Sequence, residues 1–452
     1  MPPLLTDPLV WLALLTLMLL GANLWLFLNR GWESSHRATD YARLYHPLDT
    51  PTIRRWRRQG RRRLLPVIVW HRKPAQWQLL VDGQPHATLP GDAPWIELTG
   101  PDFTGENGAR LEDHRHTYTL RPLPAGSGPD MEFGLTAIDR DFYRRRGMRV
   151  PHDFILIKTE VPVGRFKRLP VSHWTDHYRY LGAAKLAEAD RTIKDLMGIR
   201  PADEPLVRMT KIIRHLRTTW KDAGGVPKDD FRWADPLRIY EEMRDGSGKG
   251  WCTQNAQAFT FFANRAGIAT RFVFGATMQD NRLVYNGHSW AECYLPGSGR
   301  WVYVDPQASI VAVHDRRGRP LNSADLFHLC RHDALENVTA LVCSPEPDRI
   351  YTPDDPANQV PFASVSRVAR QEFNEQTIIK YRLPPNVEDV RDIYSMLLKS
   401  PTFAWTNFKR YLWQPAPAYS LLPTEGAWVY GWRRMLFVGL LGSVTALLIA
   451  LA

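Results

Sequence analysis

Three separated residues in this chain have the side-chain types needed for nucleophilic attack on a carbonyl group. They are the cysteine of Gly250-Trp251-Cys252, the histidine of Gly287-His288-Ser289-Trp290 and the aspartate of Asp305-Pro306. A thiol with its usual pKa of about 8.5 attacks poorly until its surroundings favour the thiolate. A histidine that takes the thiol proton, oriented by a carboxylate, meets this need. The order Cys, His, Asp therefore predicts a thiol nucleophile with an oriented base.

The cysteine is predicted to begin a helix. Residues 245–250 are rich in glycine, which is typical of a flexible loop. Apolar residues then recur at helical spacing from Cys252 to Arg265, and Gly267 supplies a stop. Amide N–H groups in the first turn of a helix, with the positive end of its dipole, stabilise a thiolate and can bind an oxyanion. We expect the glycines to let a substrate approach Cys252 closely.

The histidine and the aspartate are predicted to lie on neighbouring strands. Strand-like residues occupy 269–275, 288–295 and 300–306, and the last two segments flank a turn at 296–299. If this turn pairs Leu295 with Arg300, His288 and Asp305 occupy diagonal positions on one face of the sheet, because side chains alternate with period two. Asp305 can then accept a hydrogen bond from one imidazole nitrogen and leave the other for the thiol.

These segments resemble the transglutaminase-like superfamily, whose papain-like core has a cysteine at a helix start and His and Asp on neighbouring strands. The matching motifs are Gly248-Lys-Gly-Trp-Cys252, Ala263-Asn-Arg-Ala-Gly-Ile-Ala-Thr-Arg-Phe-Val-Phe-Gly275, Gly287-His-Ser-Trp-Ala-Glu292 and Trp301-Val-Tyr-Val-Asp-Pro306. By this resemblance, Cys252 is the nucleophile, His288 the base and Asp305 the orienting group of a catalytic triad. The resemblance covers residues 200–310 and implies an α+β fold for them.

The resemblance implies a mechanism more narrowly than a substrate, since the superfamily contains cross-linking enzymes, peptidases, amidases and peptide deglycosylases. It implies attack on an amide of a peptide or protein, an acyl-thioester on Cys252, and no cofactor. Trp251 precedes the nucleophile where animal transglutaminases have glutamine, which argues against cross-linking of glutamine to lysine. Because no site for an amine acceptor is visible, we expect hydrolysis in preference to transfer.

The alternative function is that of a catalytically silent scaffold. Each triad residue taken alone is more often structural, and a pseudoenzyme that keeps the triad without an open cleft would bind a peptide or an envelope polymer. For an active enzyme, Trp251, Trp290 and Trp301 are the side chains expected at the substrate cleft. No pattern of His, Cys or acidic residues indicates a metal site, and residues 245–250 lack the spacing of a phosphate-binding loop.

Two uncharged segments are predicted to be transmembrane helices. Residues 9–28 and 435–452 contain no Asp, Glu, Lys or Arg. At about 1.5 Å per residue, each is long enough to cross a hydrocarbon layer of roughly 30 Å. Trp428, Tyr430 and Trp432 precede the second segment as an aromatic belt. No Lys or Arg precedes Leu9, so a cleaved signal peptide is not expected. The sequence therefore predicts an integral membrane protein, anchored in the lipid bilayer at both ends, and the resemblance implies a bacterial inner membrane.

Basic residues lie next to both predicted spans. The net charge is +11, and much of the excess comes from residues 30–63, with the densest run from Arg54 to Arg63. Arg433 and Arg434 precede the second span. The positive-inside rule favours a cytoplasmic soluble part, but it is weaker for large domains, and the resemblance leaves the periplasm open. We expect Arg54 to Arg63 to contact anionic lipid head groups, and we expect no nucleic-acid partner.

Local sequence patterns divide the soluble part of the chain into three predicted regions. Short strand-like runs and an Asp82-Gly83 turn signal predict a β-rich domain over residues 64–165. Residues 170–320 are predicted to form the catalytic domain with preceding helices, and residues 321–430 a mixed helical region. The four cysteines have no Cys-x-x-Cys spacing, so we expect them to be mostly reduced.

Overall fold

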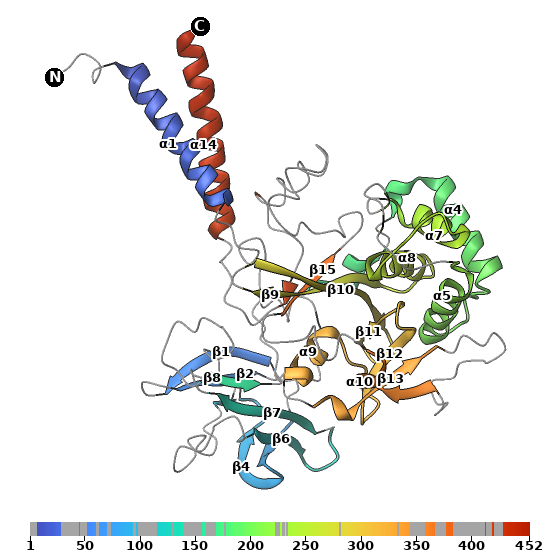
Figure 1. The fold of residues 1–452 in the computed structure, drawn as a ribbon. Helices are drawn as coiled ribbons and strands as arrows, with labels where there is room; N and C mark the ends of the chain where they lie inside the picture. The colour runs from blue at the N-terminus through green and yellow to red at the C-terminus, as the bar shows by residue number, and fades with distance from the viewer. Residues whose placement is uncertain are drawn as a thin grey trace.

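The computed structural model shows a mixed helix and sheet protein from which two long helices project (Figure 1). The structure describes residues 7–28, 45, 52–59, 63–69, 74–93, 96–97, 115–128, 130–138, 156–159, 169–175, 178–221, 227, 231, 234–279, 282–331, 334–343, 358–366, 377–382, 412, 418–419 and 428–452.

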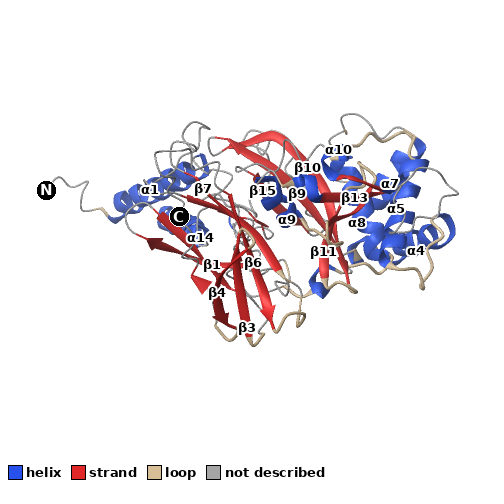
Figure 2. Ribbon diagram, turned by 90° about the horizontal axis from the view of Figure 1, so that it is seen from below, coloured by secondary structure: helices blue, strands red, loops and turns tan. Residues whose placement is uncertain are grey.

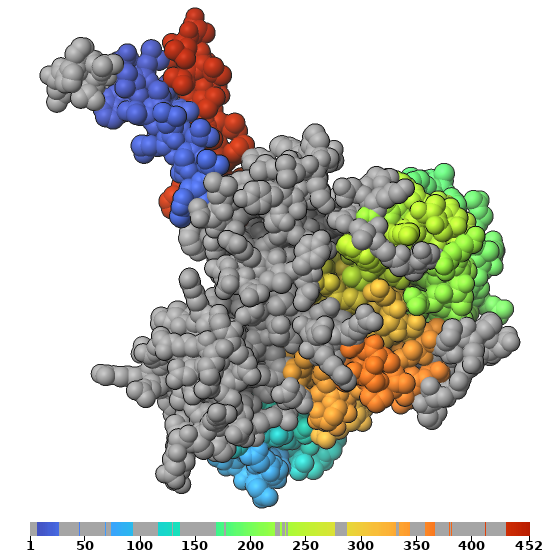
Figure 3. Space-filling model, in the orientation of Figure 1, coloured from blue at the N-terminus to red at the C-terminus, as the bar shows by residue number. Residues whose placement is uncertain are grey.

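The two projecting helices are α1 (Pro8–Leu28) and α14 (Trp428–Leu451), and they contain the predicted spans. Both are long and apolar enough to cross a membrane. They lie against each other (Figure 3), and the Asn23 Nδ2 donates to the Leu436 carbonyl at 3.0 Å. Farther along, the Leu19 side chain lies over Gly439, 3.7 Å from where a Cβ would stand. The first and last helices of the chain, α1 and α14, are therefore neighbours in space.

The N-terminal half of the soluble part is built from two antiparallel sheets. Their strands are β1 (Thr52–Gln59), β2 (Arg63–Val69), β3 (Gln76–Val81), β4 (Gln84–Pro90), β5 (Ile96–Glu97), β6 (Arg115–Leu123), β7 (Met131–Ile138) and β8 (Leu156–Thr159). One sheet has the order β1-β2-β5 and the other β4-β3-β6-β7-β8. Asp82 and Gly83 have φ of 51° and 79° and join β3 to β4 as a two-residue turn, which confirms the predicted hairpin.

Strand β1 differs from the sequence-based expectation. It falls inside residues 30–63, which we assigned to a basic juxtamembrane segment, so the β-rich region begins before residue 64. Its sequence, TIRRWRRQ, looks like a solvated charge run, but the apolar strand β2 pairs with it along its length. Pairing between strands overrides the local charge pattern here, because ladder hydrogen bonds depend on a partner and not on the side chains of β1 alone.

A second group of elements surrounds the predicted triad. In chain order it contains η5 (Val171–Trp174), η6 (Arg179–Leu181), α4 (Ala183–Arg191), η7 (Thr192–Leu196), α5 (Pro205–Thr219), α7 (Pro236–Asp245), α8 (Cys252–Arg265), β9 (Thr270–Gln279), β10 (Arg282–Leu295), β11 (Arg300–Val304) and β12 (Ile310–Asp315). The helices gather on one side of the molecule, beyond strands β9 to β11 (Figure 2). The predicted helix at Cys252–Arg265 is confirmed, and Gly267, at φ 82°, follows its end.

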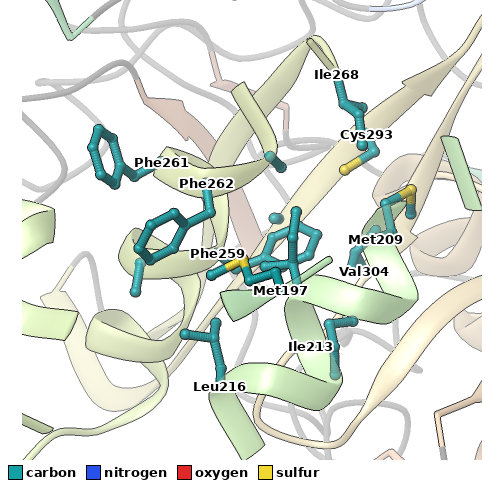
Figure 4. Packing of buried hydrophobic residues seen from close by; sticks show 14 of the residues in the cluster. Met197, Met209, Ile213, Leu216, Phe259, Phe261, Phe262, Ile268, Cys293 and Val304 are labelled. Atoms are coloured by element: carbon teal, nitrogen blue, oxygen red, sulfur yellow. The ribbon is translucent and has the colours of Figure 1, made fainter. Parts of the chain in front are cut away.

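Helix α8 lies at the centre of the main hydrophobic core. Every residue from Thr253 to Ala263 is buried. Phe259 belongs to a cluster that includes Met243 of α7, and Figure 4 shows it among Met209 of α5 and Val304 of β11. A helix buried on most faces is held by packing all round, so its first turn has a defined position relative to the sheet.

The rest of the chain completes the sheets around the triad. It contributes α9 (Ser323–Arg331), η8 (Leu335–Asn337), β13 (Val338–Val342), β14 (Gln359–Pro361), α10 (Phe362–Val365), β15 (Thr377–Arg382) and β16 (Ala418–Tyr419). Strands β12-β13-β14 form one sheet, while β15 pairs with β9 to give the order β11-β10-β9-β15-β16, the triad sheet. We expected a mixed helical region at 321–430, and this is wrong for β13 to β16. Within that region, the sequence pattern also predicts a helix over residues 387–399, which lie outside the described residues.

Candidate active site

Cys252 is the first residue of α8, as predicted. Trp251 precedes the helix in an extended conformation, and its amide N–H donates to the Gln254 Oε1 at 2.9 Å. Asn255 N–H closes the first helical turn on the Trp251 carbonyl at 3.2 Å. These contacts fix where the helix begins and place the thiol where first-turn amides and the helix dipole favour negative charge.

The glycines before Cys252 have a packing role that the sequence did not indicate. A Cβ on Gly250 would lie 2.8 Å from both Gln254 Cβ and Met243 Sδ, and one on Gly248 would lie 2.7 Å from Phe231 Cζ. In addition to the expected approach of a substrate, which stays a prediction, Gly250 lets α7 approach the start of α8 closely, because any side chain there would push the two helices apart.

His288 and Asp305 meet as the hairpin register predicts. Strands β10 and β11 pair Leu295 with Arg300 and continue to Ala291 opposite Val304. This register puts His288 and Asp305 on one face, and the His288 Nε2 lies 2.8 Å from the Asp305 Oδ2. With Nε2 engaged, the other nitrogen, Nδ1, is left to the hydrogen bond that joins His288 to the Cys252 thiol.

Asp305 is itself held by hydrogen-bond donors that the sequence alone did not indicate. Its Oδ1 accepts from the backbone N–H groups of Gln307 at 3.1 Å and Ala308 at 3.3 Å. The Tyr303 hydroxyl donates to Oδ2 at 3.3 Å. The side chain is 2% exposed, so these donors fix the carboxylate in a site from which water is largely excluded. The Asp-Pro-Gln-Ala turn was the available signal, since an aspartate commonly accepts from amides two and three residues later.

The electrostatics of the three groups favour a thiolate paired with an imidazolium. Burial disfavours the Cys252 thiolate, but the hydrogen bond and charge of His288, with the Ser289 backbone N–H, outweigh it and lower the Cys252 pKa. Burial likewise disfavours charge on His288, but the negative charge of Asp305 and the hydrogen bonds to Asp305 and Cys252 raise the His288 pKa well above its usual value. The two shifts are in the directions that activate a nucleophilic thiol.

The remaining thiols differ from Cys252. None of the four cysteines forms a disulfide. Burial raises the pKa of Cys293 to about 12, and burial also raises the pKa of Cys343. Cys330 is partly exposed on α9. Among the described residues, no cluster of three or more His, Cys, Asp or Glu side chains is suited to hold a metal ion.

The three tryptophans predicted for the substrate cleft occupy different positions. Trp251 is partly exposed beside the nucleophile. Trp290 is fully buried and stacks on the His288 ring, with centroids 5.9 Å apart and planes at 23°. Trp301 is 3% exposed and covers the Arg271 guanidinium. Trp290 and Trp301 therefore support the site from behind and present little surface to a substrate.

Thr253 and Ser289 form a contact between the start of α8 and β10 that the sequence did not indicate. Their hydroxyl oxygens lie 3.0 Å apart in a buried position. Thr253 follows the nucleophile and Ser289 follows the base, so this hydrogen bond ties together the two elements that carry Cys252 and His288. No local pattern predicts it, because the two residues come from segments that meet only in the folded chain.

In the comparison with known proteins, one family model matches part of the chain. Residues 199–306 match the family model of the transglutaminase-like superfamily. Two solved structures of the periplasmic domain of TgpA from Pseudomonas aeruginosa, one of them bound to ethylmercury, are 17% identical to the chain and cover 58% of it. The chain covers 90% and 88% of those domains, with TM-scores of 0.23 and 0.21. No curated protein matched. These low TM-scores leave the family domain and the triad geometry as the basis for a function.

Proposed function

We propose, from the transglutaminase-like domain of residues 199–306, that this chain is a membrane-anchored cysteine enzyme that cleaves amide bonds of a peptide or protein. The observation that carries the proposal is the hydrogen-bonded series from the Cys252 thiol through His288 to Asp305, with 2.8 Å between His288 Nε2 and Asp305 Oδ2. Each group has the environment that its role requires. The thiol lies at the start of a helix, the imidazole stacks on an aromatic ring, and the carboxylate is buried and accepts several hydrogen bonds.

In the first half of the reaction, the Cys252 thiolate attacks the carbonyl carbon of the substrate amide. Negative charge moves to the carbonyl oxygen, where amide N–H groups of the first turn of α8 are suited to stabilise it. The imidazolium of His288 then gives its proton to the departing amine, and the C–N bond breaks. An acyl-thioester on Cys252 and a neutral imidazole remain. Asp305 keeps the imidazole in the required tautomer.

In the second half, we propose that water is the acceptor. Neutral His288 takes a proton from water as the oxygen attacks the thioester carbonyl. The C–S bond then breaks, the carboxylic acid is released, and the thiolate of Cys252 and the imidazolium of His288 are restored. Trp251 before the nucleophile supports hydrolysis, since it departs from the glutamine of animal transglutaminases. Product analysis with an added primary amine tests this step: the free acid should dominate, and a dominant amide adduct would identify a transferase.

The reactivity of the Cys252 thiol distinguishes the proposed enzyme from the alternative, a catalytically silent scaffold. We expect iodoacetamide to label Cys252 faster than the other cysteines of the full-length chain in membranes, because its pKa is lowered, whereas burial raises the pKa of Cys293 and of Cys343. Cys330, which is partly exposed, is the internal control for access of the reagent. The excess rate should disappear in His288→Ala. If Cys252 and Cys330 react equally and slowly, the enzyme is excluded and the scaffold is favoured.

The proposal places this chemistry close to a bilayer. Helices α1 and α14 are the proposed anchors, and the arginines from Arg54 to Arg63 are proposed to contact anionic head groups. Strand β1 contains most of that run, so its charge belongs to a sheet edge and not to an irregular linker. The basic residues that follow the first span and precede the second favour a cytoplasmic soluble part.

A further inference from the structure

A buried ion pair lies in the triad sheet, between β9 and β10. Arg271 of β9 and Glu292 of β10 face each other in the ladder, and neither side chain is exposed. The Arg271 Nε and Nη2 donate to the Glu292 Oε2 at 2.9 and 2.6 Å. Burying two charges is costly unless their remaining hydrogen-bonding positions are filled. What fills them therefore decides how rigid this part of the site is.

The second carboxylate oxygen of Glu292 has two donors. The Ser323 backbone N–H, at the start of α9, donates to Oε1 at 2.7 Å. The Tyr45 hydroxyl donates to the same oxygen at 2.7 Å. The Tyr45 hydroxyl also shares a short hydrogen bond with the Tyr381 hydroxyl. Glu292 thus joins the triad sheet, the start of α9 and a residue from near the N-terminus.

Aromatic rings enclose the Arg271 guanidinium. Its central carbon lies 4.0 Å from the ring centroid of Trp301, 4.5 Å from Tyr381, 4.6 Å from Tyr45 and 5.1 Å from Trp174. Cation–π attraction strengthens when the cation is removed from water, as here. Tyr45 therefore contributes to both halves of the pair, with its ring against Arg271 and its hydroxyl on Glu292.

This cluster is connected to the catalytic base. The Trp290 Nε1 donates to the Ser323 Oγ at 2.8 Å, and the Trp290 ring stacks on His288. Ser323 is thus held by Glu292 through its backbone and holds Trp290 through its side chain. A continuous series of contacts runs from Tyr45 through Glu292, Ser323 and Trp290 to His288. All of these residues except His288 are fully or almost fully buried.

We propose that Tyr45 is a positioning residue of the triad: its hydroxyl holds Glu292 and Ser323 in place, and they hold the Trp290 ring against His288. Tyr45 follows the end of α1 at Leu28 by 17 residues, so the segment that leaves the N-terminal anchor completes the support of the catalytic base. The inference rests on the proposed function, because it takes Cys252 and His288 to be a reactive pair.

The test measures the alkylation rate of Cys252 against pH in the full-length chain in membranes. Tyr45→Phe removes one hydroxyl, and Ser323→Ala removes the acceptor for Trp290 without touching Tyr45. We expect each to lower the rate about fivefold at neutral pH, on the scale of one lost hydrogen bond. Each should also move the midpoint of the pH profile upward, since a less firmly held imidazolium lowers the thiol pKa less.

The double variant shows whether the two residues act through one path. Tyr45→Phe with Ser323→Ala should label at about the rate of either single variant, because residues in one network are not additive. Tyr118→Phe is the matched control. It also removes a buried phenol hydroxyl, but from β6 of the N-terminal sheet, and it should label like the parent chain.

Several outcomes overturn the inference. Labelling of Tyr45→Phe that matches Tyr118→Phe in rate and pH midpoint shows that Tyr45 has no positioning role, and additive losses show that Ser323 acts separately. The inference is also overturned if Tyr45→Phe fails to fold and Ser323→Ala labels Cys252 at the rate of the parent chain. If the parent Cys252 is no faster than Cys330, the proposed function itself fails, so the two failures are distinguishable.

Discussion

At the scale of single residues, the candidate site depends on Asp305 more than on any other charge. Its carboxylate raises the pKa of His288, and the resulting imidazolium lowers the pKa of Cys252. The carboxylate can do this because four donors hold it: His288, Tyr303 and the amides of Gln307 and Ala308. Removing its charge while keeping its shape should therefore change how the protein responds to pH.

The first prediction concerns Asp305→Asn. The His288 pKa lies above the ordinary value of 6.5, so the stability from protonating it is fully present below that value and is lost as pH rises through the raised pKa. The variant should lose roughly 1–3 kcal/mol of stability near pH 6, and clearly less near pH 9. Thermal unfolding at both pH values measures this difference.

Asp190→Asn is the control for that measurement. Asp190 also forms an ion pair, with Arg265 at 2.6 Å, but it lies at the surface and no histidine contacts it in the described structure. Its effect on stability should be the same at both pH values. If the loss of stability in Asp305→Asn is also the same at both pH values, Asp305 does not form an ion pair with a protonated His288.

At the scale of elements, the sheet positions the base through a glycine. Gly275 of β9 lies beneath the Trp290 ring, and a Cβ there would be 2.5 Å from Trp290 Cη2. The ring cannot easily move aside, since its Nε1 is bonded to Ser323 and its face lies on His288. The absence of a side chain at Gly275 is therefore a condition for the stacked arrangement.

The second prediction follows from that contact. Gly275→Ala should destabilise the protein by about 1–3 kcal/mol, the usual cost of overpacking, and should slow the alkylation of Cys252 because Trp290 is displaced. Gly297→Ala, in the turn between β10 and β11, is the matched control, since a Cβ there has nothing within 4 Å. Equal melting temperatures for the two variants would show that the Trp290 ring is free to shift.

Local patterns predicted the elements that carry the triad and missed what joins them. Helix α8 and the β10–β11 register follow from spacing over short stretches, so both were predictable from the sequence. Strand β15 was not, because its partner β9 lies 100 residues earlier and pairing at that distance leaves no periodic signal. The same reason hides the contact of Tyr45 with Glu292, 247 residues apart. A short loop fixes the register of a hairpin, whereas the pairing of residues far apart in the sequence depends on the packing of the whole fold.

At the scale of the whole molecule, the two terminal helices form an antiparallel pair. Leu19 packs on Gly439, and Asn23 donates to the Leu436 carbonyl. Close packing on small residues and interhelical hydrogen bonds are the main forces between helices in a bilayer. We therefore expect the pair to persist in membranes, where it would hold both ends of the soluble part at one place.

The third prediction tests the pair by oxidative cross-linking. Leu19→Cys with Gly439→Cys should form a disulfide in membranes, because these positions are in contact. Leu17→Cys with Gly442→Cys is the control, since Leu17 is 62% exposed and a Cβ at Gly442 meets nothing within 4 Å. Equal cross-linking of both pairs would mean that the helices do not pack in this register.

The fourth prediction concerns the side of the membrane. Basic residues follow the first span and precede the second, so the positive-inside rule expects the soluble part in the cytoplasm and Ala452 on the opposite side. A reporter fused after Ala452 should then give a non-cytoplasmic signal. A cytoplasmic signal, with both spans inserted, would place the triad outside the cytoplasm and overturn the charge argument.

The pairing of β15 with β9 also sets an order of events during synthesis. Seventy-seven residues separate Asp305 from Arg382, the last residue of β15. At about 5–20 residues per second, a ribosome takes roughly 4–15 s to add them. Throughout that interval, the nascent chain already contains every triad residue while β9 still has an unpaired edge. The nucleophile is therefore made well before the sheet that holds its base is complete.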